Sequence, residues 1–266
     1  MKVLEGIGSG VIRQLNYAGG LTMQFWSSLR ASTRVLPVVG KRGRWRTTMK
    51  QIIAVGTQAL PLIGILSTCV GFILALQTAA ELRKFGAVQL VISIVAIGFT
   101  RELGPLVTAI VVSGRSGSAF SAEIGTMVAT NEIDALRTMA IDPVEYVLAP
   151  KFLAAVIGVP CLTIMSSFFG IVAGAGFMYL NSDMPLRMYM TYVFDAILLR
   201  DVFLGLLKSL AFATIIAQVG CMEGLKVRGG PEAVGRSTTS AVVRSTFLVI
   251  LADLLFTAAF YFLGVE

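Results

Sequence analysis

The stretch GAVQLVISIVAIGFTRELGPLVTAIVVSG, Gly86–Gly114, decides how this chain must fold. A helix needs roughly 20 apolar residues to cross the ~30 Å hydrocarbon core of a bilayer, and this stretch is longer than that. Its only charged residues are Arg101 and Glu102, which stand side by side near its middle. The stretch therefore predicts a membrane span that carries two charges at membrane depth, where charges are costly.

The composition of the whole chain agrees with a membrane environment. Apolar residues make up 56% of the 266 residues and charged residues 14%, against about 25% in soluble domains. The mean hydropathy is +0.81. We predict an all-α integral membrane protein, with a basic segment over 1–50 and a five-span domain over 51–266. The expected spans are 52–80, 86–114, 152–181, 202–222 and 245–265.

The basic residues predict the direction of the chain. If the N-terminus is cytoplasmic, the inside segments 1–50, 115–151 and 223–244 hold sixteen Lys and Arg, and the outside segments hold four. Lys and Arg accumulate in cytoplasmic loops of membrane proteins. We therefore expect a cytoplasmic N-terminus and a C-terminal Glu266 on the opposite side.

The first 50 residues have the pattern of a helix that lies on the membrane surface. Apolar residues recur every three or four positions: Leu4, Ile7, Val11, Leu15 and Ala18. This spacing predicts an interfacial amphipathic helix on the cytoplasmic leaflet. The run KRGRWRTTMK, Lys41–Lys50, resembles a nucleic-acid patch, but it stands directly before the first span. Anchoring on anionic lipid explains the run better, and we expect no nucleic acid as a partner.

Several chemistries are excluded by what the sequence lacks. The chain has no histidine, and its three cysteines form no CxxC pair, so we predict no metal site and no catalytic residues. No GxxxxGK[ST] motif is present, so the chain has no means of hydrolysing ATP. We expect no cofactor on this chain.

Four ionisable residues are predicted at membrane depth: Arg101, Glu102, Lys208 and Asp253. Each costs roughly 2.5–3.5 kcal/mol at the centre of a membrane helix, and their charges sum to zero. Counting about 1.5 Å of rise per residue places Lys208 and Asp253 near the midplane. Two interpretations remain open: a neutral cluster that joins spans two, four and five, which we favour, or a proton or ion path. Leu103-Gly104-Pro105 predicts a local helix break directly after Arg101 and Glu102.

Other residues inside the spans predict local distortion or close packing. Pro61 in span one and Pro160 in span three can kink their helices. GIVAG, Gly170–Gly174, has the GxxxG spacing that permits close helix contact, although such motifs are common by chance.

The segment between spans two and three, residues 119–142, predicts a short cytoplasmic helix. Its apolar positions are Ile133, Leu136 and Met139, and its charged positions are Glu132, Asp134 and Arg137. Asn131 is placed to cap this helix and Asp142-Pro143 to end it. The helix can rest on the membrane or dock a soluble partner in a groove, and the residues alone leave both uses open.

Arg101 to Ala154, RELGPLVTAIVVSGRSGSAFSAEIGTMVATNEIDALRTMAIDPVEYVLAPKFLA, closely resembles the signature of the MlaE family. These proteins are permeases of ABC transporters that work with MCE-domain proteins. The later segments LKSLAF with Lys208, GRSTTSAVV, and LADLLFTA with Asp253 are also similar to the family. Val128 and Asn131 stand where the family pattern has a basic and an acidic residue.

The resemblance implies a homodimer in a bacterial inner membrane or plastid inner envelope. It implies ATPase subunits, which carry the ATP and Mg, beneath the permease, and an MCE-domain protein on the periplasmic side. Some such systems add a STAS-domain protein. The implied cargo is phospholipid moved between the inner and outer membranes.

The resemblance also assigns roles to positions in this sequence. Residues Asn131–Ala140 become the coupling helix, and we expect the ATPase contact at Glu123, Glu132, Asp134, Leu136 and Arg137. Spans one and five line a lipid pocket at the dimer interface, with Leu74, Leu76 and Gln77 as its expected lining. The alternative is a proton-coupled secondary carrier that uses Glu102 and Asp253. The odd number of spans and the lack of an evident internal repeat count against it.

Overall fold

The computed structural model describes residues 19–32, 42–87, 89–182 and 185–264. Within these residues the secondary structure is helical throughout, and five helical stretches are long and apolar enough to cross a membrane. They are Arg46–Phe85, Leu90–Ala129, Val144–Asn181, Leu199–Leu225 and Pro231–Phe262. The predicted all-helical fold with five spans is confirmed.

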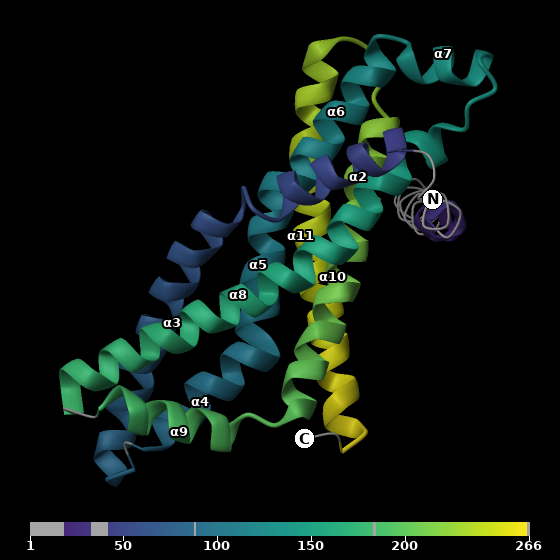
Figure 1. The fold of residues 1–266 in the computed structure, drawn as a ribbon. Coiled ribbons are helices and arrows are strands. Elements are labelled where there is room, and N and C mark those ends of the chain that lie inside the picture. Colours follow the sequence, from purple (N-terminus) through teal and green to yellow (C-terminus); the bar gives the residue numbers. More distant parts are fainter. Residues whose placement is uncertain (1–18, 33–41, 88, 183–184, 265–266) are drawn as a thin grey trace, which may run out of the picture.

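The main helices form a tilted bundle with short helices at both ends (Figure 1). They are α2 (Arg42–Val55), α3 (Leu60–Leu82), α4 (Leu90–Gly98), α5 (Gly104–Val112), α6 (Ser118–Ala129), α7 (Glu132–Thr138), α8 (Ala149–Ser182), α9 (Leu186–Ala196), α10 (Leu199–Leu225) and α11 (Pro231–Phe262). The turn η2 (Arg83–Phe85) is a 3-10 helix, and η3 (Phe99–Leu103), η4 (Ser113–Gly117) and η5 (Val144–Leu148) are π-helical. We refer to the opposite ends of the bundle as the α7 end and the α9 end.

The first span is interrupted, where the sequence predicts one continuous helix over 52–80. A turn over Gly56–Ala59 separates α2, which lies across the bundle, from α3 (Figure 1). Pro61 lies in the first turn of α3, where its missing N–H costs nothing. Arg115 donates from its guanidinium to the Ala54 carbonyl, which the interruption frees, at 2.9 Å. It also donates to the side chain of Gln58, at 2.7 Å from Oε1.

Two spans extend further toward the α7 end than predicted. The second helical stretch continues through the Ser- and Gly-rich run after Gly114 as far as Ala129, so most of the expected loop over 119–142 is helix. Helix α11 begins at Pro231 rather than near Ser245. Hydropathy marks only the apolar part of a helix, so these polar extensions were missed.

Small residues let α3 and α8 pack closely. A Cβ atom on Gly71 would meet the backbone of Gly170, with 2.7 Å to its Cα, and Gly170 itself leaves room for the Phe99 ring. One turn away, the buried hydroxyls of Ser67 and Ser166 lie 2.7 Å apart and share a hydrogen bond. The GxxxG motif at Gly170–Gly174 therefore does mark a helix contact.

An amphipathic helix between spans three and four was not predicted. Helix α9 closes the end of the bundle opposite α7 (Figure 1). Its Tyr189 is buried, and its hydroxyl donates to the Ile171 carbonyl at 3.1 Å. Burial raises the pKa of Tyr189 to about 12. Phe194, on the same helix, is exposed. The run LRMYMTYVFDA is too short and polar to register as a span, which is why it was overlooked.

The predicted N-terminal pattern from Leu4 to Ala18 lies outside the described residues. The helix over 19–32 that follows it packs on the bundle through Phe25, whose ring is 6.2 Å from that of Phe152. Its Met23 and Trp26 side chains are exposed. One face of this segment therefore meets the bundle and another is apolar and open.

Replacing Gly71 by Ala should destabilise the protein, because the new methyl group has no space against Gly170. Gly176 is the matched control: it also lies in a long apolar helix, and its Cβ would meet nothing within 4 Å. Ala there should leave stability unchanged or raise it by up to about 1 kcal/mol, since Gly is the weaker helix former. Thermal unfolding in detergent measures both, and equal effects would contradict this account of α3–α8 packing.

Candidate functional site

The paired charges Arg101 and Glu102 lie on the π-helical turn η3. The Gly104 N–H donates to the Phe99 carbonyl, five residues back, instead of four. Pro105 has no N–H to offer the Arg101 carbonyl, so the regular pattern cannot continue through this turn. The sequence predicts a helix break at this point, but the helix continues and is only widened. π turns of this kind are frequent at functional sites.

Helix α10 approaches this turn closely and brings Lys208 to it. Gly205 makes the approach possible, because a Cβ there would collide with the Thr100 carbonyl. One turn later, the Lys208 side chain is 1% exposed, and its ammonium forms an ion pair with Glu102. It also donates to Asp253 Oδ1 at 3.0 Å and to Thr257 Oγ1 at 2.8 Å. Spans two, four and five are joined at this point.

Arg101 does not belong to this cluster, contrary to our prediction of a four-charge network. Its Nε lies 3.7 Å from Asp201 Oδ1, at the start of α10. Asp201 Oδ2 also accepts the Leu198 N–H at 3.0 Å, so this carboxylate caps its own helix. The charges therefore separate into a neutral pair and the cluster of Glu102, Lys208 and Asp253, which holds two carboxylates and one ammonium.

Sequence reasoning missed two members of this region. Thr257 lies four residues after Asp253, on the same face of α11, and helical spacing could have identified it. Asp201 lies seven residues before Lys208, two turns away on α10, and directly precedes the predicted span over 202–222. A carboxylate in the first turn of a helix is a common cap, and this signal was available.

The cluster reaches the surface of the single chain. The Glu102 side chain is 37% exposed and Thr257 is also exposed, although both lie within the apolar spans. An ionised group in a span faces a protein interior or a water-filled cavity rather than lipid. This side of the chain is therefore unsuited to contact with acyl chains.

At the α7 end, the predicted apolar face of the loop helix is turned inward. Ile133 and Leu136 are buried in this chain's own core, against Ile124, Val147 and Leu148. Their burial leaves them unavailable to a partner's groove in this structure, which argues against the expected partner contact at Leu136. Met139, at 61% exposed, is the member of the predicted face that remains accessible.

The charged residues of α7 form its outer surface. Glu132, Asp134 and Arg137 are exposed, and Arg137 NH1 lies 3.2 Å from Asp134 Oδ1. Asn131 precedes the helix with a φ of 60° and makes no side-chain cap, and α7 ends at Thr138. Asp142 accepts the Val144 N–H at 2.9 Å, so it starts the next helical turn instead of ending α7. Helix α7 projects from the bundle (Figure 1).

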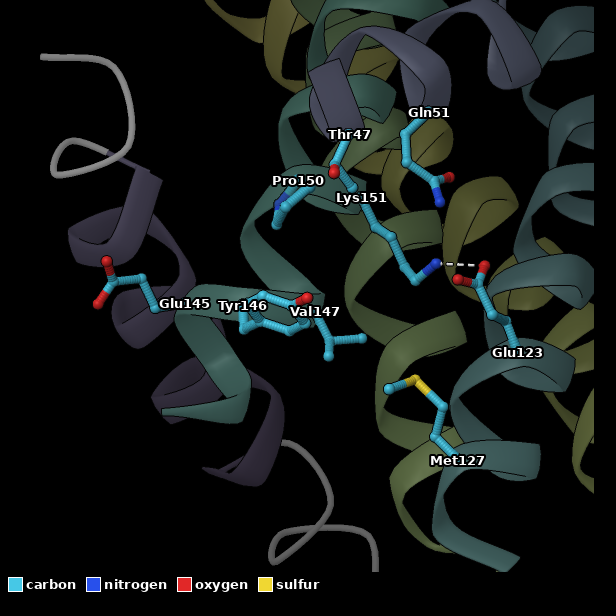
Figure 2. Close-up of a pocket in the computed structure, with 9 residues that line it drawn as sticks. All are labelled: Thr47, Gln51, Glu123, Met127, Glu145, Tyr146, Val147, Pro150 and Lys151. Carbon is cyan, nitrogen blue, oxygen red and sulfur yellow. Dashed lines mark hydrogen bonds and ion pairs between the residues drawn. The ribbon is translucent and has the colours of Figure 1, made fainter. Parts of the chain in front are cut away.

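Glu123, predicted as a partner contact, is engaged within the chain. Its Oε2 lies 2.5 Å from Lys151 Nζ, beside a cavity of about 120 Å3 (Figure 2). Lys151 lies 5.4 Å from the Phe120 ring centroid. Another carboxylate at this end, the buried Glu223, accepts from Arg244 NH1 at 2.8 Å.

Lys226 lies near the same carboxylate, with 3.7 Å between its Nζ and Glu223 Oε1. Burial lowers the pKa of Lys226 and Arg244 lowers it further, while Glu223 opposes both. The end of α10 and the middle of α11 are therefore joined by a second group of charges.

The three residues expected to line a lipid pocket do not share one surface. Leu76 and Gln77 are exposed on α3, whereas Leu74 turns inward and packs beside Gly98 of α4. Residues two apart on a helix are about 200° apart, so Leu74 and Leu76 cannot line one pocket. Leu76 and Gln77 stay as the candidates.

Comparison with known proteins now gives the family. Residues 48–259 match the family model described as Permease MlaE. The chain belongs to the MlaE permease family. A probable ABC transporter permease protein of Rickettsia typhi is 36% identical over 211 residues, which cover 79% of this chain and 81% of the relative. A further probable ABC transporter permease protein, from Synechocystis, is 37% identical over 78% of this chain and 79% of its own length.

A plant protein is also similar. Protein Trigalactosyldiacylglycerol 1, chloroplastic, of Arabidopsis thaliana is 33% identical over 227 residues, which are 85% of this permease and 65% of the plant protein. The family and the five apolar helices together make this chain a multi-pass membrane protein.

Replacing Lys208 by Met should destabilise the permease strongly, by about 3–5 kcal/mol, because two carboxylates within the apolar spans lose their common counter-ion. Glu102→Gln should cost only about 1–2 kcal/mol, because Lys208 keeps Asp253. Thermal unfolding in detergent gives the order of the two. Lys84→Met, at an exposed pair with Glu81, should have almost no effect. If Glu102→Gln proved as damaging as Lys208→Met, the division of charges described above would be wrong.

Proposed function

We propose that this permease is the membrane subunit of an ATP-driven ABC transporter that moves phospholipids between inner and outer membranes. The observation that carries the proposal is the family match over 48–259, together with relatives named as probable ABC transporter permeases. The name of the Arabidopsis relative contains that of a glycerolipid, which favours lipid as cargo. The chain offers no nucleotide-binding motif, so ATP is hydrolysed on a separate ATPase chain.

The α7 end is the proposed docking site for this ATPase. Helix α7 projects from the bundle and exposes Glu132, Asp134 and Arg137, and the exposed Met139 directly follows it. A helix that rested on an anionic membrane would favour Lys and Arg on its polar face, and here two of the three charges are acidic. The buried Ile133 and Leu136 pack α7 against the bundle, so a displacement of α7 by the ATPase would also move the spans.

We further propose a homodimer in which a second copy covers the face formed by α11 and η3. Exposed apolar residues follow α11 at alternating steps of four and three: Val243, Phe247, Ile250 and Leu254. This spacing forms a seam suited to another helix, and Thr257 continues it. The partly exposed Glu102 lies beside the same seam, where a second copy would shield it from lipid.

The direction of the chain decides on which side of the membrane the other partners would bind. With the N-terminus cytoplasmic, the α9 end faces the periplasm of a bacterial inner membrane, and an MCE-domain protein would meet the permease there. A STAS-domain protein, in systems that have one, would bind the ATPase. Phospholipid would enter between the two copies, near Leu76 and Gln77.

A proton-coupled carrier is the alternative function, and the membrane carboxylates are its support. Both Glu102 and Asp253 bind the same ammonium, that of Lys208. A structural tie between helices accounts for this arrangement without a proton path. Reconstituted permease that moves lipid with a pH gradient and no ATPase would favour the carrier instead.

Changing Glu132 and Asp134 together to Lys should weaken ATPase binding at least tenfold, a loss of about 1.4 kcal/mol, because the proposed contact is made by this acidic surface. Co-purification of the ATPase with the variant measures the effect. The matched control is Glu81→Lys at the other end of the bundle, which should leave binding unchanged. Full retention of the ATPase by the double variant would remove α7 as the docking site.

A photo-crosslinking residue at Leu76 should capture phospholipid more strongly than one at Phe262, because Leu76 is placed at the proposed pocket and Phe262 at the far end of α11. A residue at Leu74, which faces inward, should capture less lipid than Leu76. Mass spectrometry of the labelled permease gives the three yields. Equal labelling at Leu76 and Phe262 would indicate ordinary contact with bulk lipid.

A further inference from the structure

We propose that the Lys151–Glu123 ion pair is the joint through which movement of α7 reaches the transmembrane helices. Lys151 and Glu123 are then positioning residues that couple ATP hydrolysis to lipid movement. The inference rests on the proposed function, because it takes α7 as the place where the ATPase acts.

Two helical segments connect α7 to the bundle, and we call them the legs of α7. Each leg is continuous with a membrane span. Helix α6 leads to α7 and ends at Ala129, and η5 leads away from α7 into α8 from Val144 onward. Lys151 lies in the first turn of α8 and Glu123 lies halfway along α6. The pair therefore ties the two legs together on the membrane side of α7.

The two partners differ in their freedom to move. The Lys151 side chain is 2% exposed and the Glu123 side chain is 53% exposed. The Lys151 side chain is almost wholly buried, so separating its ammonium from Glu123 leaves a buried charge uncompensated. Its position next to the Phe120 ring on α6 adds a second attraction to the same helix. Lys151 thus fixes α8 to α6 as long as Glu123 is in place.

The cavity beside the pair allows the joint to open on one side. Its volume of about 120 Å3 is large enough to hold water, and Thr47, Gln51 and Tyr146 contribute to its wall. In Figure 2 the side chains of Thr47 and Gln51 lie close to Lys151, while the Glu145 carboxylate points away from it. Glu123 can turn toward this space when α6 shifts, and α2 borders the same space through Thr47 and Gln51.

A purely structural ion pair and a coupling joint have different consequences. A structural pair affects stability, and every function of the complex would fall in parallel. A coupling joint affects the ratio of lipid moved to ATP hydrolysed, because the ATPase still binds and turns over while the spans no longer follow α7. Coupling between two sites is typically a factor of roughly 5–150.

The test uses the full permease with its ATPase in phospholipid vesicles, with ATP hydrolysis and transfer of a fluorescent phospholipid measured together. Glu123→Gln and Lys151→Met should keep the ATPase bound and hydrolysing ATP, while lipid moved per ATP falls at least fivefold. Lys151→Arg keeps the charge and should keep most of the ratio. The control is Glu223→Gln, which removes another ion-paired carboxylate of the α7 end; Glu223 joins α10 to α11 instead of α6 to α8.

The outcomes separate this inference from the function on which it rests. If the parent complex moves lipid and Glu123→Gln leaves the ratio unchanged, the joint is refuted and the proposed function stands. An equal fall of lipid moved per ATP in Glu223→Gln also refutes the joint, since the loss of any ion-paired carboxylate at the α7 end would then have the same effect. If the parent chain binds no ATPase, both proposals fail. Glu123→Gln preserves shape and leaves a half-exposed position neutral, so it answers the question even if Lys151→Met does not fold.

Discussion

The Lys208 ammonium is the point on which the arrangement of the spans depends. A single buried cation binds Glu102 on span two and both Asp253 and Thr257 on span five, and no apolar contact could specify these partners so narrowly. Burial of charge is costly, so the pairing adds little net stability, but the loss of one partner is severe. Such a cluster therefore selects one packing of the helices from the many that apolar surfaces would allow.

Irregular helix is what brings the polar groups of this permease into position. A proline lies two residues after the turns η3 and η5. Pro105 follows η3, and Pro150 follows η5. Each proline removes a backbone donor, and the helix is widened before it. Glu102 lies within η3 and Lys151 lies three residues after η5, and both side chains reach neighbouring helices. The interruption at Gly56 works similarly, since Arg115 binds the carbonyl that it frees. The polar sites thus depend on departures from ideal geometry.

Sequence reasoning succeeded where one strong physical effect dominates. Five long apolar runs have no other stable environment than a bilayer, and the approach of Lys208 to Glu102 and Asp253 follows from depth and charge. It failed where two effects compete. Ile133 and Leu136 have the spacing of an apolar docking face. An apolar face can pack equally well against a partner or against the chain's own core, and here it is buried in the core. Arg101 was assigned to the central cluster because depth along a helix says nothing of direction around it, and the π turn directs it to Asp201.

The single chain also has an open face that its own residues do not complete. Glu102 is partly exposed at membrane depth, and the exposed side chains of α11 form an apolar seam that leads directly to Thr257. In water such a seam alone would drive association, but in a membrane lipid tails satisfy apolar side chains equally well. The charge changes this balance, because acyl chains cannot solvate a carboxylate. A second copy, or water held between two copies, removes that cost, so the cluster that orders the spans within one chain also favours the proposed dimer.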